Sequence, residues 1–142
     1  MSKRVLKGSA TKLSKGKIRV LIADDSRAVL SSLCRYLELD GRFEIVGTAF
    51  NGVRLVHQVN RCQPDLVLVD LSMPQMNGLE ATLQLRKSFP ELRLLIYSGL
   101  HGVSLRDECL RSGADGFIKK SEMPESLMQE VTRLFPDTQI SE

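Results

Sequence analysis

Residues 64–78 read PDLVLVDLSMPQMNG, and the first half of this stretch decides the fold. Leu66 to Val69 is an unbroken apolar run of strand length, with β-branched residues at alternate positions. Such a run indicates a strand that is covered on both faces, as in parallel sheets. The run ends in Asp70. Because ligands bind at the carboxyl ends of the strands in open α/β sheets, we expect Asp70 to lie at the active edge.

The alternation of strand and helix patterns continues on both sides of this stretch. The expected strands cover residues 18–23, 43–49, 66–70, 92–97 and 117–120, and the expected helices begin near residues 26, 51, 79, 105 and 124. Five strand–helix repeats with short connections predict a parallel sheet with right-handed crossovers and helices on both faces. We therefore expect a single-domain α/β fold, a flavodoxin-like (βα)5 doubly wound sheet with strand order 2-1-3-4-5.

Acidic residues close two strands that this order places side by side. Asp24 and Asp25 end the first strand and Asp70 ends the third, so all three should share one pocket. An aspartate after a strand often only caps the next helix, which is the alternative for each residue alone. Crowded carboxylates raise one another's pKa unless a cation compensates, and their hard oxygens suit Mg²⁺. The set of three predicts a magnesium site.

Groups suited to phosphoryl transfer end the two remaining strands of this edge. The fourth strand is followed by Ser98 and the fifth closes on Lys119 and Lys120. A carboxylate that attacks phosphorus needs a cation, an ammonium group and hydrogen-bond donors around the equatorial oxygens. A lone serine or lysine here would usually be a loop residue, so the prediction rests on their convergence on Asp70.

Several of these motifs together resemble the receiver domain of response regulators in bacterial two-component signalling. They are the spacing Asp-x-x-Met-Pro-x-Met-x-Gly from Asp70 and the segment Gly113-Ala114-Asp115-Gly116-Phe117, and the resemblance covers residues 18 to about 136. It implies that Asp70 is the phosphoacceptor and that Asp24 and Asp25 bind Mg²⁺ together with Asp70 and the backbone carbonyl of Ser72.

The resemblance also implies roles at the fourth and fifth strands. Ser98 would be the hydroxyl that follows the phosphoryl group, Lys120 the phosphate-binding lysine with Lys119 as the competing candidate, and Phe117 the switch aromatic. The chain departs from the family pattern in two places. Ser121 follows the lysine where many receivers have proline, and Phe117 lacks the hydroxyl of a tyrosine.

The function implied by the resemblance is signal transduction. The receiver would accept a phosphoryl group on Asp70 from a sensor histidine kinase or phosphotransfer protein and change the surface of the fourth helix, fifth strand and last helix. It would not be an enzyme, although it assists its own phosphoryl transfer and dephosphorylation.

The motifs look like those of receivers fused to a LuxR-type helix-turn-helix domain that controls transcription. No such domain lies in these 142 residues, so DNA would be reached only through a missing output domain, and phosphorylation could drive homodimerisation.

The alternative within the family is a stand-alone or degenerate receiver that acts as an interaction module without phosphorylation. Outside the family, a flavin-binding protein would need a phosphate cradle where Asp24 and Asp25 place negative charge. A nucleotide hydrolase would need a Gly-x-x-x-x-Gly-Lys-Ser/Thr loop, which is absent from the sequence. A phosphatase with an Asp-x-Asp loop fits poorly because the acids after the first strand are adjacent.

Charge and composition set the remaining expectations. Residues 1–17 hold six basic residues and no acid, so 14 basic and all 17 acidic residues follow and give −3. We expect 1–17 to be a flexible basic leader, 18–136 the receiver domain and 137–142 a tail or the start of a linker. No apolar run approaches the roughly 20 residues of a membrane span, and no signal peptide opens the chain. Three cysteines without Cys-x-x-Cys spacing fit a reducing compartment, so we expect a cytoplasmic protein without membrane contact.

Overall fold

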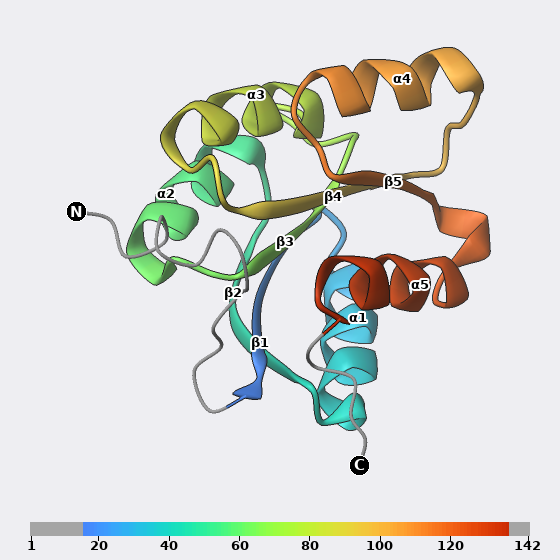
Figure 1. The fold of residues 1–142 in the computed structure, drawn as a ribbon. Helices are drawn as coiled ribbons and strands as arrows, with labels where there is room; N and C mark the ends of the chain where they lie inside the picture. The colour runs from blue at the N-terminus through green and yellow to red at the C-terminus, as the bar shows by residue number, and fades with distance from the viewer. Residues whose placement is uncertain (1–15, 137–142) are drawn as a thin grey trace.

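The computed structural model describes residues 16–136, which form a five-stranded parallel sheet with helices on both faces (Figure 1). The strands are β1 (Ile18–Ala23), β2 (Phe43–Ala49), β3 (Leu66–Asp70), β4 (Arg93–Ser98) and β5 (Gly116–Lys119). The helices are α1 (Arg27–Asp40), α2 (Gly52–Cys62), α3 (Gly78–Ser88), α4 (Val103–Arg111) and α5 (Glu125–Leu134), with a 3₁₀ turn, η3 (Lys120–Glu122), before α5. The order β2-β1-β3-β4-β5 confirms the predicted fold.

The predicted leader and tail fall almost wholly outside the part of the chain that the structure describes. Residues 1–15 and 137–142 are not described, so the expectations for both ends stay predictions.

The sheet separates two hydrophobic cores. On one face, Leu30, Leu33 and Leu37 of α1 join Leu127 and Val131 of α5 against the strands. On the other face, residues of α2, α3 and α4 pack against the alternate strand positions, including Leu55, Leu85 and Cys109. Figure 1 shows α1 and α5 together on one side of the sheet and α2 and α3 on the opposite side. Because β3 has a core on each face, all five of its residues are buried.

Helix starts are defined by capping residues. The Ser26 hydroxyl accepts the Val29 N–H at the start of α1, and Asn77 forms a reciprocal capping box with Glu80 at the start of α3. At the other end of α1, Gly41 has φ 89°, a left-handed conformation that costs glycine little. These caps fix where α1 starts, after residues 24–26 that follow β1, and where α3 starts, after the loop of residues 71–77 that follows β3.

Gly78 lets α3 begin close to the end of β3. A Cβ at this position would lie 2.6 Å from the Asp70 carbonyl oxygen, and the Gly78 N–H donates to the Leu71 carbonyl at 2.9 Å. Any side chain there would force the backbone apart. Glycine therefore keeps the loop after Asp70 tight.

Several predicted boundaries are shifted by one or two residues. The N–H of Leu92 donates to the Phe89 carbonyl in the preceding turn, so β4 pairing starts at Arg93 and extends to Ser98. The strand β5 ends at Lys119 because Lys120 enters the 3₁₀ turn. The helix α4 begins at Val103, two residues earlier than expected.

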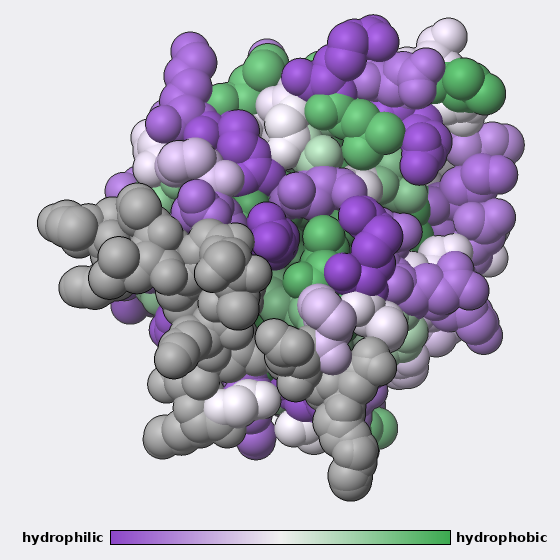
Figure 2. All heavy atoms as spheres, viewed as in Figure 1, coloured by the Kyte–Doolittle hydropathy of each residue, from purple (hydrophilic) through white to green (hydrophobic). Residues whose placement is uncertain are grey.

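Within residues 16–136, no helix has the length and apolar character that crossing a bilayer requires. On the side of the molecule seen in Figure 2, hydrophobic residues form separate patches between hydrophilic ones.

Candidate functional site

The carboxyl ends of β1 and β3 bring three aspartates together. These strands are hydrogen-bonded neighbours, with Ala23 paired to Val69, so Asp24 and Asp70 follow from adjacent positions. One carboxylate oxygen from each of Asp24, Asp25 and Asp70 lies within 4.8 Å of the others. Asp24 and Asp70 are buried, whereas Asp25 is exposed. The predicted carboxylate cluster is therefore present.

Both oxygens of Asp24 accept hydrogen bonds. The backbone N–H of Ser26 donates to Oδ1 at 2.8 Å, and the hydroxyl of Tyr97 donates to Oδ2 at 2.7 Å. Burial, followed by the charge of Asp24, raises the pKa of the Tyr97 phenol well above its usual value, so the phenol keeps its proton. Tyr97 was not among the residues expected at the site, because its place in the apolar run of β4 indicates only a core residue.

The Asp70 carboxylate contacts one hydrogen-bond donor and one ammonium group, but its buried surroundings disfavour the ionised form. The backbone N–H of Ser72 donates to Oδ1 at 3.3 Å, and the ammonium group of Lys120 lies 3.5 Å from Oδ2. Burial raises the pKa of the Asp70 carboxyl to about 6, with a further rise from Asp24, against the lowering effects of Lys120 and Ser72. A cation in this pocket would relieve that repulsion.

The two candidate lysines have different surroundings. The Lys120 Nζ lies 3.5 Å from Asp70 Oδ2 and 4.0 Å from Asp24 Oδ2, whereas the Lys119 Nζ lies 3.8 Å from Glu122. Lys119 is the last residue of β5, and Lys120 opens the turn that bends toward the aspartates. The geometry favours Lys120 as the group that faces Asp70.

The predicted switch residues lie on β4 and β5. Ser98 is buried at the end of β4, where its hydroxyl oxygen accepts the Leu100 N–H at 2.9 Å. Phe117 is half-buried and lines a hollow of about 330 Å³ together with His101, which precedes α4, and with Val103 and Arg106 of α4. A rotation of Phe117 would therefore alter the surface between α4 and β5.

A wide opening lies beside Asp25, the exposed member of the aspartate cluster. It has a volume of about 610 Å³ and is lined by Asp25, by the loop residues Leu71, Ser72, Met73, Pro74 and Asn77, and by Leu79 and Leu105. Ser72 thus lies at the same opening as Asp25. The predicted role of its carbonyl as a metal ligand stays a prediction.

The donor set fits a hard divalent cation. Three carboxylates supply oxygen atoms only, the ligand type that Mg²⁺ prefers, and the exposed Asp25 leaves room for water to complete the coordination. Burial first and the negative charge of Asp24 second raise the pKa of Asp70, and a bound cation would oppose both effects.

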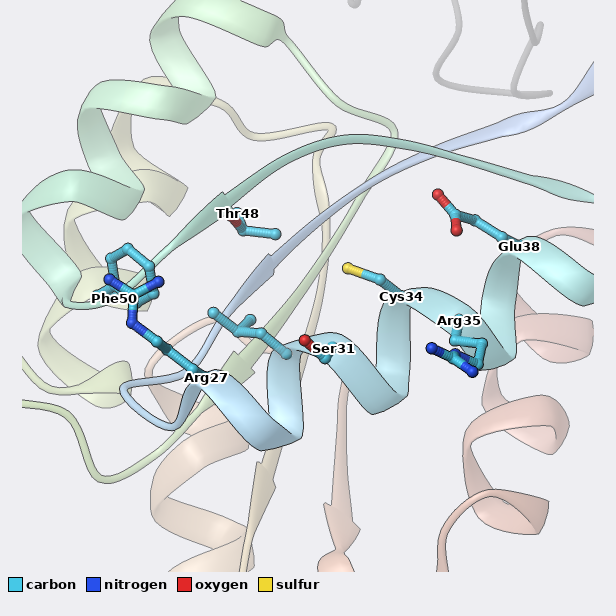
Figure 3. A pocket seen from close by; sticks show the side chains of 8 residues that line it. Arg27, Ser31, Cys34, Arg35, Glu38, Thr48 and Phe50 are labelled. Carbon is cyan, nitrogen blue, oxygen red and sulfur yellow. The ribbon is translucent and has the colours of Figure 1, made fainter.

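A separate hollow of about 410 Å³ lies between α1 and the end of β2 (Figure 3). Its lining includes Arg27, whose guanidinium stacks on Phe50 with 4.6 Å to the ring centroid, together with Cys34 and Thr48. The lining contains none of the three clustered aspartates. This hollow is therefore separate from the carboxylate cluster.

Fold and site together define a class of α/β protein: a doubly wound sheet with an acidic pocket and a lysine at the carboxyl edge. The family model for the response regulator receiver domain matches residues 20–132. The chain belongs to this family, which confirms the resemblance inferred from the sequence.

Two relatives of this chain are longer proteins. The chain is 34% identical over 110 residues to a protein-glutamate methylesterase/protein-glutamine glutaminase of Clostridium acetobutylicum, covering 76% of this chain and 32% of that protein. It is 30% identical over 119 residues to the transcriptional regulatory protein DegU of Brevibacillus brevis, covering 84% and 50%. This chain thus spans about a third to a half of the length of these relatives.

Solved structures show the same fold. In the CheX–CheY–BeF3–Mg complex from Borrelia burgdorferi, the matching chain has a TM-score of 0.78 and 26% identity, with 84% of this chain and 96% of that chain covered. Structures of LuxR-family response regulators also match.

Proposed function

We propose that this chain is a phosphoacceptor that receives a phosphoryl group on Asp70 from a histidine kinase or phosphotransfer protein. The observation that carries the proposal is the position of Lys120, 3.5 Å from Asp70 in a pocket that already holds Asp24 and Asp25. This combination offers a nucleophile, a cation-binding pair and an ammonium group at one edge of the sheet. Membership of the receiver family supports it.

In the transfer step, a carboxylate oxygen of Asp70 attacks the phosphorus of a phosphohistidine. The new O–P bond forms as the N–P bond breaks, and the departing imidazole keeps the electron pair and takes up a proton. Lys120 pairs with phosphoryl oxygens, and the Ser72 N–H holds the carboxylate in place. The residues that would hold Mg²⁺ are Asp24, Asp25, Asp70 and Ser72, the last through its backbone carbonyl. When bound, the cation would neutralise part of the negative charge of the phosphoryl group.

The signal then leaves through Ser98 and Phe117. A phosphoryl group on Asp70 offers acceptor oxygens that favour inward movement of the Ser98 hydroxyl, which gives up its present bond to the Leu100 N–H. Phe117 turns into the space behind it and changes the surface of α4, β5 and α5. A partner or second copy that prefers this surface shifts the equilibrium by its differential affinity.

Control of transcription is the output we infer. DegU, a transcriptional regulatory protein of which the match covers 50%, and structures of LuxR-family regulators are among the relatives. The proposed role of the site is that of a phosphoacceptor, and the match to the methylesterase covers 32% of that protein. A cytoplasmic location agrees with a kinase partner.

The test is labelling with a small phosphodonor. Incubation with Mg²⁺ and acetyl phosphate should add one phosphoryl group that is stable to acid and labile to base, detected by intact-protein mass spectrometry. Asp70→Asn should abolish it, and Asp107→Asn, an exposed aspartate of α4, should not. Labelling that persists in Asp70→Asn would refute Asp70 as the acceptor. Absence of labelling in the native chain, by both acetyl phosphate and kinase, would favour the interaction-module alternative.

A further inference from the structure

Tyr97 occupies a core position but also makes a specific polar contact. Its side chain is 1% exposed and packs in the same cluster as Ile22, Leu30 and Ile118. Its hydroxyl donates to Asp24 Oδ2 at 2.7 Å and lies 3.5 Å from the Ala23 carbonyl oxygen. Packing alone would need only a phenylalanine here. The buried hydroxyl instead donates a short, charge-assisted hydrogen bond to a single charged partner, Asp24.

Asp24 depends on this bond for its orientation. The carboxylate is 0% exposed, so neither oxygen can rely on bulk water, and the Ser26 N–H and the Tyr97 hydroxyl hold one oxygen each. A buried charge without such partners is costly. The two donors come from different parts of the chain, one from the turn after β1 and one from β4, and together they fix the plane of the carboxylate.

Tyr97 also lies beneath the lysine of the site. The Lys120 Nζ lies 5.5 Å from the centroid of the Tyr97 ring and 4.0 Å from Asp24 Oδ2, the oxygen that accepts the Tyr97 hydroxyl. The ring contributes a cation–π contact, and the hydroxyl contributes the hydrogen bond. Substitution by phenylalanine separates the two contributions, because it removes only the second.

We propose that Tyr97 is a positioning residue of the metal site, which holds the Asp24 carboxylate in the orientation that binds Mg²⁺. The inference rests on the proposed function, since it takes Mg²⁺ as the ligand of the aspartate cluster. Groups that hydrogen-bond to metal-ligating carboxylates typically contribute about 10–100-fold to metal affinity. Loss of the Tyr97 hydroxyl should therefore weaken Mg²⁺ binding by about 10-fold.

The first measurement is Mg²⁺ titration by calorimetry on the full chain and two variants. Tyr97→Phe should bind Mg²⁺ about 10-fold more weakly than the native chain. Tyr36→Phe removes the hydroxyl of the other tyrosine, which lies on the surface of α1, and should bind Mg²⁺ with native affinity. In Tyr97→Phe, raising the Mg²⁺ concentration should restore the rate of labelling by acetyl phosphate, because orientation and not the nucleophile has been changed.

The second measurement uses tyrosine emission, since the chain has no tryptophan and two tyrosines. In Tyr36→Phe only Tyr97 emits, and Mg²⁺ binding at Asp24 should change that emission at the concentrations that calorimetry gives. Two results would overturn the role of Tyr97 while leaving the metal site in place. One is tyrosine emission that does not change at saturating Mg²⁺, and the other is a Mg²⁺ affinity of Tyr97→Phe within two-fold of the native value. Absence of Mg²⁺ binding by the native chain would overturn the metal site itself and this inference with it.

Discussion

The ammonium group of Lys120 lies 3.5 Å from Asp70 Oδ2, although Asp70 ends β3, Lys120 follows β5, and β4 lies between these two strands. The contact forms because β5 ends at Lys119 and the chain turns back over the carboxyl edge of the sheet. The same ammonium group lies 4.0 Å from Asp24. Lys120 is thus a cationic partner shared by two buried carboxylates, and its removal should affect both chemistry and stability.

Replacement of Lys120 by methionine should slow phosphorylation of Asp70. The side chain keeps its length but loses the charge that would stabilise the phosphoryl oxygens, and loss of one such donor costs on the order of 10²-fold in rate. The rate is measured by mass spectrometry with acetyl phosphate and Mg²⁺. Lys119→Met is the matched control, since Lys119 pairs with Glu122. Equal rates in the two variants would contradict the assignment of Lys120.

Removal of the Asp25 carboxylate should weaken metal binding without loss of the fold. Asp25 is exposed, so Asp25→Ala removes a hard ligand at little cost in packing. We expect Mg²⁺ affinity to fall by at least about 10-fold, measured by calorimetry, with the melting temperature in EDTA unchanged or slightly raised as repulsion declines. Asp107→Ala, on the surface of α4, serves as the control. Native Mg²⁺ affinity in Asp25→Ala would exclude a shared carboxylate site.

Neutralisation of Asp70 should stabilise the metal-free protein, and the gain should depend on pH. The pKa of Asp70 in the folded protein is raised from 3.8 to about 6, so the folded state holds this proton more tightly than the unfolded state. The ionised carboxylate therefore destabilises the fold above about pH 6, and this penalty disappears as the pH falls toward 4. Asp70→Asn should gain about 1–3 kcal/mol at pH 7 and little at pH 4.

Denaturant unfolding in EDTA at the two pH values measures this gain. Saturating Mg²⁺ at pH 7 should reduce the difference between native and Asp70→Asn, because the cation compensates the ionised carboxylate in the native chain. A gain that is the same at pH 4 and pH 7 would mean that the substitution acts through packing and not through charge.

Substitution of the two switch residues should separate phosphorylation from its consequence. Ser98→Ala removes the hydroxyl that would follow the phosphoryl group, and Phe117→Ala removes the ring that lines the hollow beside α4. Both variants should still accept phosphate on Asp70, with weaker phosphate-dependent association. Sedimentation with and without beryllofluoride, a stable phosphoryl mimic, measures this association in the native chain and in the two variants. An equal change in assembly would show that the signal leaves by another surface.

The pattern of apolar residues along the sequence was sufficient to predict most of the fold. The strands β1, β2 and β3 have the predicted bounds because each is an apolar or half-buried run ended by turn residues or acids. The boundaries of β4 and β5 shifted by one residue, because pairing at strand ends is decided by hydrogen bonds to neighbours, as at Leu92 and Lys120. Local patterns do not contain those partners.

The acidic cluster was predictable from the sequence alone, since Asp24, Asp25 and Asp70 stand at the ends of strands whose adjacency follows from the fold. Two features depended on the tertiary structure. Which lysine faces Asp70 is decided by the turn at the end of β5, which sends neighbouring side chains to different partners. The polar role of Tyr97 arises because β4 places its hydroxyl across β3 from the end of β1, within hydrogen-bond distance of Asp24. A pattern of apolar residues marks a position as buried, but only the packed sheet decides which buried groups meet.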